Sequence, residues 1–224
     1  MNSNLAVGLR STAVAIALLA AGAQPSAHAA PPPPPPSLTP PAGNAQFLVI
    51  HGQGTQNYIC EPSAAGGAPS FVFIGPQSIF SKRVSFSKTL ELVQNFQSTV
   101  PGKTATPLAG CFPNFAGNEQ ICPTFQSAID QSVVWGTKLA SLTAGTDPSC
   151  PNANSVACLL VQAIAVGPSP SYSGLLSKTS FVQRLDTAGG NPPTTACTPG
   201  QLAFVPYSAT YHFFSPQGAK ASAH

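Results

Sequence analysis

Val205-Pro-Tyr-Ser-Ala-Thr-Tyr-His-Phe213, near the C-terminus, alternates between two kinds of side chain. The odd-numbered residues are apolar or aromatic, and the even-numbered residues are polar except for Pro206. A period of two with one apolar face predicts a half-buried β-strand. Because Pro206 has no backbone N–H to donate, we expect the start of this strand to lie at a sheet edge or a bulge.

Several other runs of the chain have the composition of strands. They are rich in apolar and β-branched residues, are separated by clusters of Gly, Pro, Ser and Asn, and lie at residues 46–51, 56–60, 71–74, 133–139, 156–166 and 179–186. The run at 156–166 also fits a buried helix, and residues 88–97 predict one short helix. Because strands and helices do not alternate regularly, the sequence predicts an all-β fold, an antiparallel β-sandwich or a barrel-like single domain with at most one short helix.

The composition stands out for its low charge. Charged residues make up 7% of the chain and the formal net charge is +3, whereas roughly a quarter of the residues of an average soluble domain are charged. This balance offers no electrostatic footprint for nucleic acid, so we expect no nucleic-acid partner. Pro 25 and Gly 19 supply many turn-forming residues, which suits a chain of many strands.

The N-terminal residues have the three zones of a secretory signal peptide. A start that ends in Arg10 precedes an apolar run at 12–23, and Ala27-His-Ala29 supplies the small residues of a cleavage site. The run is shorter than the about 20 residues that cross a bilayer, although an uncleaved anchor is the alternative. We predict a signal peptide at 1–29, a secreted or periplasmic location, and no membrane span in the mature chain.

The rest of the chain divides by composition into three parts. Residues 30–44 include a run of six prolines from Pro31 to Pro36 and predict a Pro-rich linker, an extended polyproline spacer. Residues 45–215 are the predicted β domain. The polar residues 216–224 are predicted to form a flexible tail.

All six cysteines follow the predicted signal peptide: Cys60, Cys111, Cys122, Cys150, Cys158 and Cys197. An even number in an exported chain predicts three disulfides, for which 15 connectivities exist. Cys111 and Cys122 flank a short loop with Pro, Asn and Gly, and Cys150 and Cys158 flank one with Pro and Asn. These pairings would leave Cys60 to pair with Cys197. A zinc site is not favoured, because no Cys-x-x-Cys pair occurs.

Two motifs of catalytic proteins begin in this sequence without being completed. His51-Gly-Gln-Gly54 could open a dinucleotide fingerprint, but Asn57 stands at the position of the third glycine. Residues 167–171 lack the closing glycine of a hydrolase nucleophile elbow. Gly52 and Gly54 instead predict a turn or bulge between the first two strands. The sequence therefore identifies no catalytic residues, and we predict no metal and no cofactor.

Six residues are candidates for contacting a ligand: Tyr58, Asp130, Arg184, Tyr207, Tyr211 and His212. Aromatic side chains on an open strand face can stack on sugars or apolar molecules. The alternative places the tyrosines in the core, because Tyr207 and Tyr211 share a face with Ala209. Arg184 can bind an anion or a carboxylate, and its alternative is a local salt bridge with Asp186. His212 lies on the polar face, where a simply exposed histidine is the alternative to a functional one.

Several blocks occur together in this chain: Tyr58-Ile-Cys60, Thr179-Ser-Phe-Val-Gln-Arg184, Thr187-Ala-Gly-Gly190, Pro193, Cys197 and Val205-Pro-Tyr-Ser-Ala-Thr-Tyr211. Together they resemble a secreted family of bacteria and fungi, domain of unknown function DUF3455. The resemblance implies that Cys60 and Cys197 are the family's own disulfide pair, and it brings no established activity. Asp130-Gln131 stands where the family has an Asp-Gly turn, so Gln131 would have to adopt a positive φ.

Three functional hypotheses follow. The first is an exported binding or interaction module for a small apolar molecule, a glycan or an envelope protein. The second is a passive structural or matrix protein with a neutral surface. The third is a secreted hydrolase, which would need at least two of His51, Asp130, Arg184 and His212 to converge in one cleft within hydrogen-bond reach. No oligomeric state is predicted.

Overall fold

The computed structural model describes residues 32–63, 66–85, 88–102, 106–114, 116–169 and 171–218. Apart from one 3₁₀ turn, η1 (Pro36–Leu38), these residues contain strands and loops but no helix. The strands are β1 (Asn44–Glu61), β2 (Ser70–Ser85), β3 (Lys88–Thr99), β4 (Phe112–Pro113), β5 (Gln120–Ser127), β6 (Val133–Leu142), β7 (Cys158–Gly167), β8 (Phe181–Gly189) and β9 (Leu202–Pro216). The prediction of an all-β fold is confirmed.

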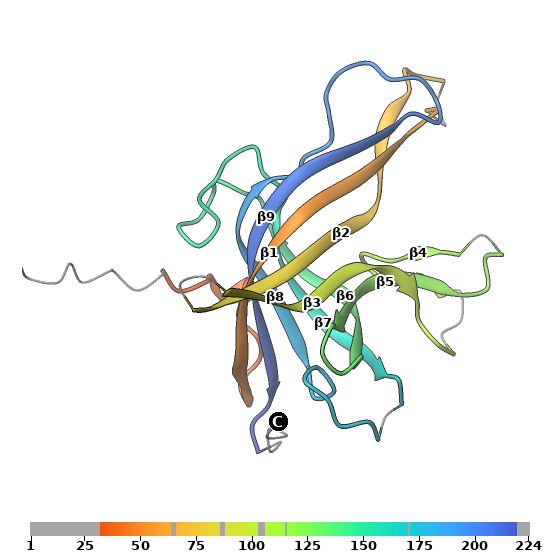
Figure 1. Ribbon diagram of the computed structural model, residues 1–224. Helices are drawn as coiled ribbons and strands as arrows, with labels where there is room; N and C mark the ends of the chain where they lie inside the picture. The colour runs from red at the N-terminus through yellow and green to blue at the C-terminus, as the bar shows by residue number, and fades with distance from the viewer. Residues whose placement is uncertain are drawn as a thin grey trace, which may run out of the picture. The chain divides into compact units, whose positions relative to one another are not determined.

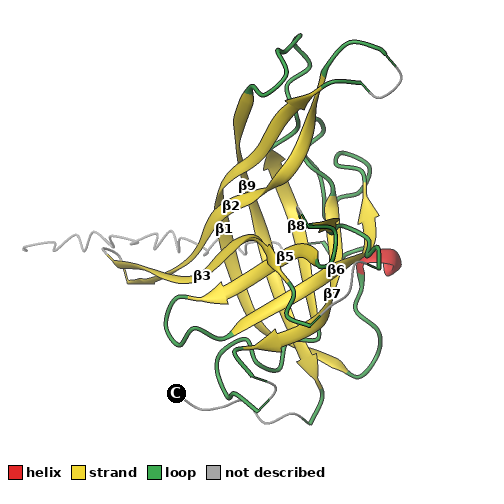
Figure 2. Cartoon of the chain, turned by 90° about the vertical axis from the view of Figure 1, so that its right-hand side faces the viewer, coloured by secondary structure: helices red, strands yellow, loops and turns green. Residues whose placement is uncertain are grey.

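The strands close into a barrel (Figures 1 and 2). Antiparallel neighbours follow in the order β3-β2-β1-β9-β8-β7-β6-β5, and a further pairing between β3 and β5 joins the two ends. Eight strands form the closed barrel, and the short β4 pairs with β5 as an extra strand. Of the two predicted architectures, the barrel is therefore the one that forms. Closure of the barrel pairs the backbone N–H and C=O groups that would remain unpaired at the edges of an open sheet.

β9 has the alternation expected for the C-terminal stretch. Its Tyr207, Ala209, Tyr211 and Phe213 are at most 4% exposed, whereas the residues between them are more accessible. β9 pairs with β1 over nearly its whole length but with β8 only from Tyr207 onward. Pro206 therefore lies beside a free edge, as its missing N–H predicts.

β3 replaces the helix that the sequence predicts at 88–97. It pairs with β2 on one side and with β5 on the other, and Leu92, Val93 and Asn95 are buried. The helix prediction was wrong because it rested on the local pattern of a short segment. Pairing with two strands, one of them distant in sequence, overrides such weak local preferences.

Gly52 and Gly54 form neither the predicted turn nor a bulge, because β1 runs through both as one continuous strand and its register shifts lie elsewhere. A Cβ atom at Gly52 would lie 2.6 Å from Cε1 of Phe80 and 2.8 Å from Cε2 of Tyr211. A Cβ atom at Gly54 would lie 2.1 Å from the carbonyl oxygen of Gln77. The two glycines therefore allow neighbouring groups to approach the backbone of a long strand closely.

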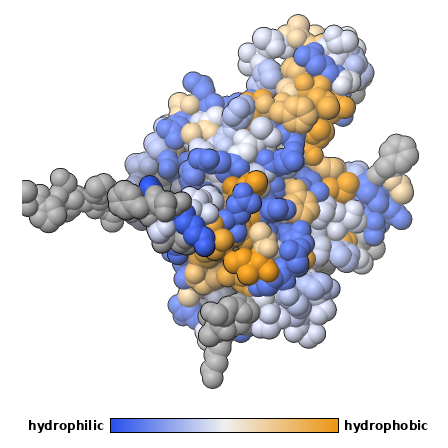
Figure 3. All heavy atoms as spheres, in the orientation of Figure 1, coloured by the Kyte–Doolittle hydropathy of each residue, from blue (hydrophilic) through white to orange (hydrophobic). Residues whose placement is uncertain are grey.

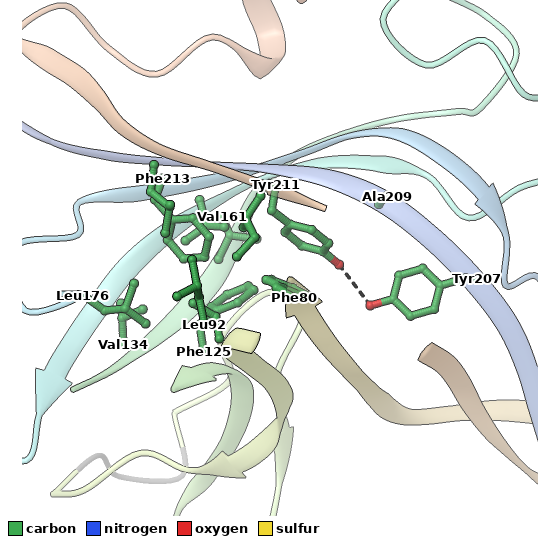
Figure 4. Packing of buried hydrophobic residues seen from close by; sticks show 14 residues of the cluster. Phe80, Leu92, Phe125, Val134, Val161, Leu176, Tyr207, Ala209, Tyr211 and Phe213 are labelled. Carbon is green, nitrogen blue, oxygen red and sulfur yellow. Dashed lines mark hydrogen bonds between the residues drawn. The ribbon is translucent and has the colours of Figure 1, made fainter. Parts of the chain in front are cut away.

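Aromatic rings fill one part of the barrel interior (Figure 4). Phe80 and Tyr211 stack with their ring centroids 4.0 Å apart, and Phe125 meets Phe213 edge to face at 5.6 Å. The other buried residues of this core are Leu48, Ile50, Leu92, Val93, Val134, Val161, Leu176, Val182, Tyr207 and Ala209. The interpretation of Tyr207 and Tyr211 as core residues is confirmed.

A second apolar cluster packs residues of η1 against β7 and β8. Leu38 is fully buried there, and its neighbours are Ala144, Cys150, Cys158, Leu160, Phe181 and Leu185. Nε2 of Gln183 also donates a hydrogen bond to the carbonyl oxygen of Leu38 at 2.7 Å. From Pro36 onward, the predicted linker is therefore docked on the barrel instead of acting as a free spacer, because Leu38 removes its apolar side chain from water.

The barrel runs from Asn44, at the start of β1, to Pro216, at the end of β9. The predicted signal peptide at 1–29 lies outside the described residues, as do 30–31 of the predicted linker and 219–224 of the predicted tail. Within the described part of the chain, no helix has the length and apolar character needed to cross a membrane.

The ends of β1, β2 and β9 continue beyond the closed part of the barrel as a projecting ribbon, seen at the top of Figure 1. We define the ribbon as residues 57–61, 70–75 and 202–204, which pair with one another. Large apolar side chains are exposed on it: Val72, Phe73, Ile74, Leu202 and Phe204. Figure 3 shows apolar atoms gathered at this part of the surface.

Three disulfides form, in the pairing that the sequence favours: Cys60–Cys197, Cys111–Cys122 and Cys150–Cys158. The first joins the end of β1 to the loop between β8 and β9, across a sequence separation of 137. The backbone N–H of Cys60 donates to the carbonyl oxygen of Gln201 at 2.8 Å, and that of Gly200 donates to Cys60 at 2.9 Å. This bond therefore anchors the β8–β9 loop to the ribbon.

Candidate functional site

A partly open cavity of about 510 Å³ lies in the barrel beside the aromatic core and reaches the base of the ribbon at Tyr58 and Phe73. All eight strands of the ring contribute to its wall, together with β4 and the loops that precede β4, β7 and β9. The apolar lining includes Phe73, Phe112, Phe125, Leu159, Val161 and Val182. Small-molecule sites have volumes of about 300–1,000 Å³, and eight-stranded barrels are wide enough to enclose one small ligand.

The two-residue period of the strands selects which side chains enter the cavity. On β8, Val182 and Arg184 line it, whereas Gln183 between them contacts Leu38 on the outside. On β1, the lining residues Gln56 and Tyr58 are likewise two positions apart. The register of β8 therefore brings a guanidinium group into an interior that is mainly apolar.

Tyr211 separates the cavity from the aromatic core. Its hydroxyl oxygen lies 3.0 Å from that of Tyr207 (Figure 4). The Tyr207 hydroxyl oxygen in turn lies 2.8 Å from Oγ of Ser78. Burial raises the pKa of Tyr211 well above its usual range, the Tyr207 hydroxyl raises it further, and the charge of Arg184 opposes both. Tyr211 is therefore a neutral phenol that can donate or accept a hydrogen bond at the cavity wall.

Tyr58 connects the cavity wall to the β8–β9 loop. Its hydroxyl donates to the carbonyl oxygen of Gly190 at 2.5 Å, and its ring meets Phe73 edge to face with centroids 5.7 Å apart. Burial raises the pKa of Tyr58, and the charge of Arg184 partly offsets this effect. Because Asn191 in the same loop also lines the cavity, the Tyr58 hydrogen bond helps to fix that side of the wall.

Arg184 is the cation of the cavity interior. Its Nη2 donates to the carbonyl oxygen of Ala157 at 2.7 Å, while Nε is buried and has no hydrogen-bond partner among the described residues. Lys138 also lines the cavity and is exposed, which places it at the rim. Neither Asp nor Glu occurs among the described lining residues, and Asp186 is exposed elsewhere. The lining therefore carries positive charge without a carboxylate to balance it.

Amide side chains supply the rest of the polar lining: Gln56, Asn95, Gln97 and Asn191. Nδ2 of Asn95 donates to the carbonyl oxygen of Thr124 at 3.0 Å. Nε2 of Gln56 and Oε1 of Gln97 are buried without a partner in the part of the chain that the structure describes. Since buried polar atoms are nearly always hydrogen-bonded, the wall retains unused hydrogen-bonding capacity.

The structure brings together half of the predicted ligand-binding residues. Tyr58, Arg184 and Tyr211 line the cavity, and Tyr207 lies behind Tyr211 through the contact of their hydroxyl groups. Asp130 and His212, in contrast, are not among the residues that line it.

His212 is excluded from the cavity by the alternation of β9, which places it on the opposite face from Tyr211. Its Nδ1 lies 2.7 Å from Oε1 of Gln46. Burial lowers the pKa of His212. His212 therefore does not contribute to this cavity, and the contact that the structure shows for it joins β9 to β1.

Asp130 is engaged in holding two loops together. Its Oδ1 accepts hydrogen bonds from the backbone N–H and the hydroxyl of Ser132 at 3.0 and 2.7 Å, and its Oδ2 accepts one from the N–H of Leu175 at 2.6 Å. Gln131 has a φ of 62°, as the expected turn requires. Burial raises the pKa of Asp130, but hydrogen bonds from Ser132, Leu175 and Ser127 outweigh it and hold the pKa at about 2.

We expect acid to weaken the fold through Asp130. Its folded-state pKa lies below the about 3.9 of an unfolded aspartate, so its stabilising contribution is complete above about pH 4 and is lost as the pH falls through about 2. In thermal denaturation followed by circular dichroism, the midpoint of the wild type should fall more between pH 4 and pH 2 than that of Asp130→Asn. The exposed Asp186→Asn variant should keep the wild-type slope, and equal slopes for all three would contradict the assignment.

The sequence reasoning missed most of the polar lining. Gln56 was detectable, because it interrupts an inward series on β1 that is otherwise apolar or glycine, with Ile50 and Tyr58 among its members. Lys138 and Gln97 line the same cavity only because β3 and β6 curve around the ring. No local sequence pattern predicts that curvature.

A second hollow of about 620 Å³ is formed by residues of β1, β2, β3 and β5. Its amide side chains are Gln53, Gln77, Gln94, Asn95 and Gln126, and Phe96 is the aromatic residue among its described lining. None of these described residues is charged, so this hollow lacks the electrostatic character of the barrel cavity.

Comparison with known proteins adds a family and no activity. Residues 41–215 match a family described as protein of unknown function (DUF3455). This range spans the strands of the barrel from β1 to all but the last residue of β9. The match confirms the resemblance inferred from the sequence blocks. No curated protein and no solved structure matches the chain.

Proposed function

We propose that this chain, which belongs to the DUF3455 family, is an exported binding protein that holds a small, largely apolar molecule inside its barrel. The proposal rests on the cavity of about 510 Å³. Protein interiors are normally packed as densely as organic crystals, whereas the aromatic core here occupies only part of the ring. A concave, partly open space with mainly apolar walls and a few polar groups is suited to a small ligand.

Export is supported by two features of the chain. Residues 1–29 have the zones of a signal peptide. All six cysteines are paired in disulfides, and disulfides persist in oxidising compartments such as the periplasm and the extracellular space. Whether the protein stays in the periplasm or is secreted does not affect the binding proposal.

The alternatives explain less of the structure. The hydrolase hypothesis needs at least two of four residues in one cleft: His51, Asp130, Arg184 and His212. Of these, Arg184 alone is among the described lining of the barrel cavity. A passive structural role requires no cavity. A glycan or an envelope protein would not need a cavity of about 510 Å³ in the barrel, whereas its concave, mainly apolar wall favours removal of a small molecule from water.

The proposal predicts that the purified protein, with its disulfides formed, binds one uncharged apolar dye. N-phenyl-1-naphthylamine becomes fluorescent in apolar surroundings, and its titration should saturate at one dye per chain. Leu159→Trp adds a large side chain to the cavity wall and should weaken dye binding by at least about tenfold, which corresponds to about 1.4 kcal/mol.

The matched control is Leu202→Trp, which makes the same substitution at a side chain that is 50% exposed on the ribbon. This variant should bind the dye with wild-type affinity. If Leu159→Trp does not melt cooperatively, Ala157→Leu fills the same cavity with a smaller change. Dye binding that never saturates, or that responds equally to the cavity and ribbon substitutions, would refute the proposal.

A further inference from the structure

We infer that the molecule held in the barrel is an amphiphilic anion, such as a fatty or aromatic carboxylate, with its head group at Arg184 and its apolar body along the cavity wall. The inference rests on the proposed function, because it names the ligand class of the same cavity. It follows from the charge, the hydrogen-bonding groups and the apolar surface that the lining combines.

The described lining of the cavity contains no counter-ion for the charge of Arg184. A guanidinium cannot be deprotonated in proteins, and enclosing an ion without a partner is costly. Arg184 donates from Nη2 to Ala157, but its Nε has no partner within the described chain, and the described lining contains no carboxylate. An anion in the cavity would supply the missing negative charge.

The groups around Arg184 suit an oxyanion. A guanidinium presents a planar set of donors that matches a carboxylate. The Arg184 side chain is also within hydrogen-bonding reach of the Tyr211 hydroxyl, and both its charge and this contact lower the pKa of Tyr211. Either hydroxyl of the Tyr207–Tyr211 pair can be the hydrogen-bond donor. Tyr211 can therefore accept a hydrogen bond from Tyr207 and donate a hydrogen bond to the ligand.

The remaining wall requires an apolar body on the same ligand. Phe73, Phe125, Leu159 and Val161 line the cavity that contains Arg184. A small hydrophilic anion such as inorganic phosphate would leave these side chains facing water, whereas an acyl chain or an aromatic ring would cover them. Lys138 at the exposed rim adds a second positive charge, which favours the approach of anions.

Competition against the neutral dye tests the inference. Octanoate and 1-octanol have the same chain length and differ in the charge of the head group. Octanoate should displace the dye from the wild-type protein at a concentration at least about tenfold lower than 1-octanol. The reason is that a hydrogen bond to a charged group strengthens binding by at least about tenfold.

Arg184→Gln should remove the preference for octanoate over 1-octanol. It should weaken displacement of the dye by octanoate by about 10- to 100-fold and leave displacement by 1-octanol unchanged. Arg83→Gln is the matched control, since Arg83 is exposed on β2 and is not among the described cavity residues. It should keep the wild-type preference. Arg184→Met, which retains an apolar stem, makes the same test if Arg184→Gln does not melt cooperatively.

The outcomes separate the two proposals. Equal displacement by octanoate and 1-octanol, with saturable dye binding, would overturn the anionic ligand and leave the binding function standing. A preference for octanoate that survives both Arg184 substitutions would overturn the role of Arg184. Failure of the wild-type protein to bind the dye at all would overturn the proposed function on which the inference rests.

Discussion

Replacement of Phe80 by alanine is expected to lower the free energy of unfolding by about 3–5 kcal/mol, the range observed when a buried phenylalanine is truncated. Phe80 is 0% exposed, stacks on Tyr211 and lies with its ring centroid 6.1 Å from that of Phe125. Strands joined into a closed ring cannot easily collapse into the vacated volume. We therefore expect a loss in the upper part of the range, measured by urea denaturation.

Phe204→Ala provides the matched control for this prediction. It removes the same atoms from a side chain that is 58% exposed on the projecting ribbon, so its effect should stay within about 0.5 kcal/mol. Both variants should unfold in a single cooperative transition. Similar losses for Phe80→Ala and Phe204→Ala would show that the stacked rings do not form the principal core.

Removal of the Cys60–Cys197 bond by a double substitution to serine is expected to cost about 5 kcal/mol. In the chain-entropy description, a disulfide restricts the unfolded chain more as the closed loop grows, and this bond spans a sequence separation of 137. The bond also anchors the loop that carries Asn191 at the cavity wall. We therefore expect weaker dye binding as well as a lower urea midpoint for the double variant.

Removal of the Cys111–Cys122 bond is the corresponding control. Its sequence separation is 11, for which the same description gives about 3 kcal/mol. The variant without the Cys60–Cys197 bond should therefore lose more free energy of unfolding than the variant without the Cys111–Cys122 bond. An equal or reversed order of the two urea midpoints would argue against loop length as the principal source of stabilisation.

The all-β class was predictable because a two-residue period is local. The alternation around Tyr207 and Tyr211 requires only neighbouring residues, and it reports directly which face of a strand is buried. The disulfide pairing was accessible for a related reason, since two of the pairs close short loops. These features need no knowledge of how distant strands are arranged.

The choice between sandwich and barrel was not predictable in this way. It depends on the pairing of β3 with β5, which joins the two ends of the sheet and has no local sequence signature. The same pairing turned the predicted helix at 88–97 into a strand. The prediction of a turn at Gly52 and Gly54 was wrong for a similar reason, because the ring of Phe80 that requires Gly52 belongs to another strand.

The candidate site was only partly predictable. Arg184 and Tyr211 could be nominated from their residue types and strand positions, and both line the cavity. Asp130 was nominated as a titratable group, yet its hydrogen bonds to Ser132 and Leu175 give it a role in loop structure. Residue type alone could not distinguish a carboxylate that holds a turn from one that faces a ligand.

The projecting ribbon exposes two strand edges, and each ends at a proline at its base. β2 pairs with β3 only from Ser78 onward, and β9 pairs with β8 only from Tyr207 onward, so the edges of the ribbon are free. A proline lies at the base of each free edge, Pro76 on β2 and Pro206 on β9. Because proline cannot donate a backbone hydrogen bond, an incoming chain would meet an interrupted template. An added strand could therefore pair only along the short ribbon, which presents apolar side chains such as Phe204, and could not extend its pairing past the prolines onto the closed barrel.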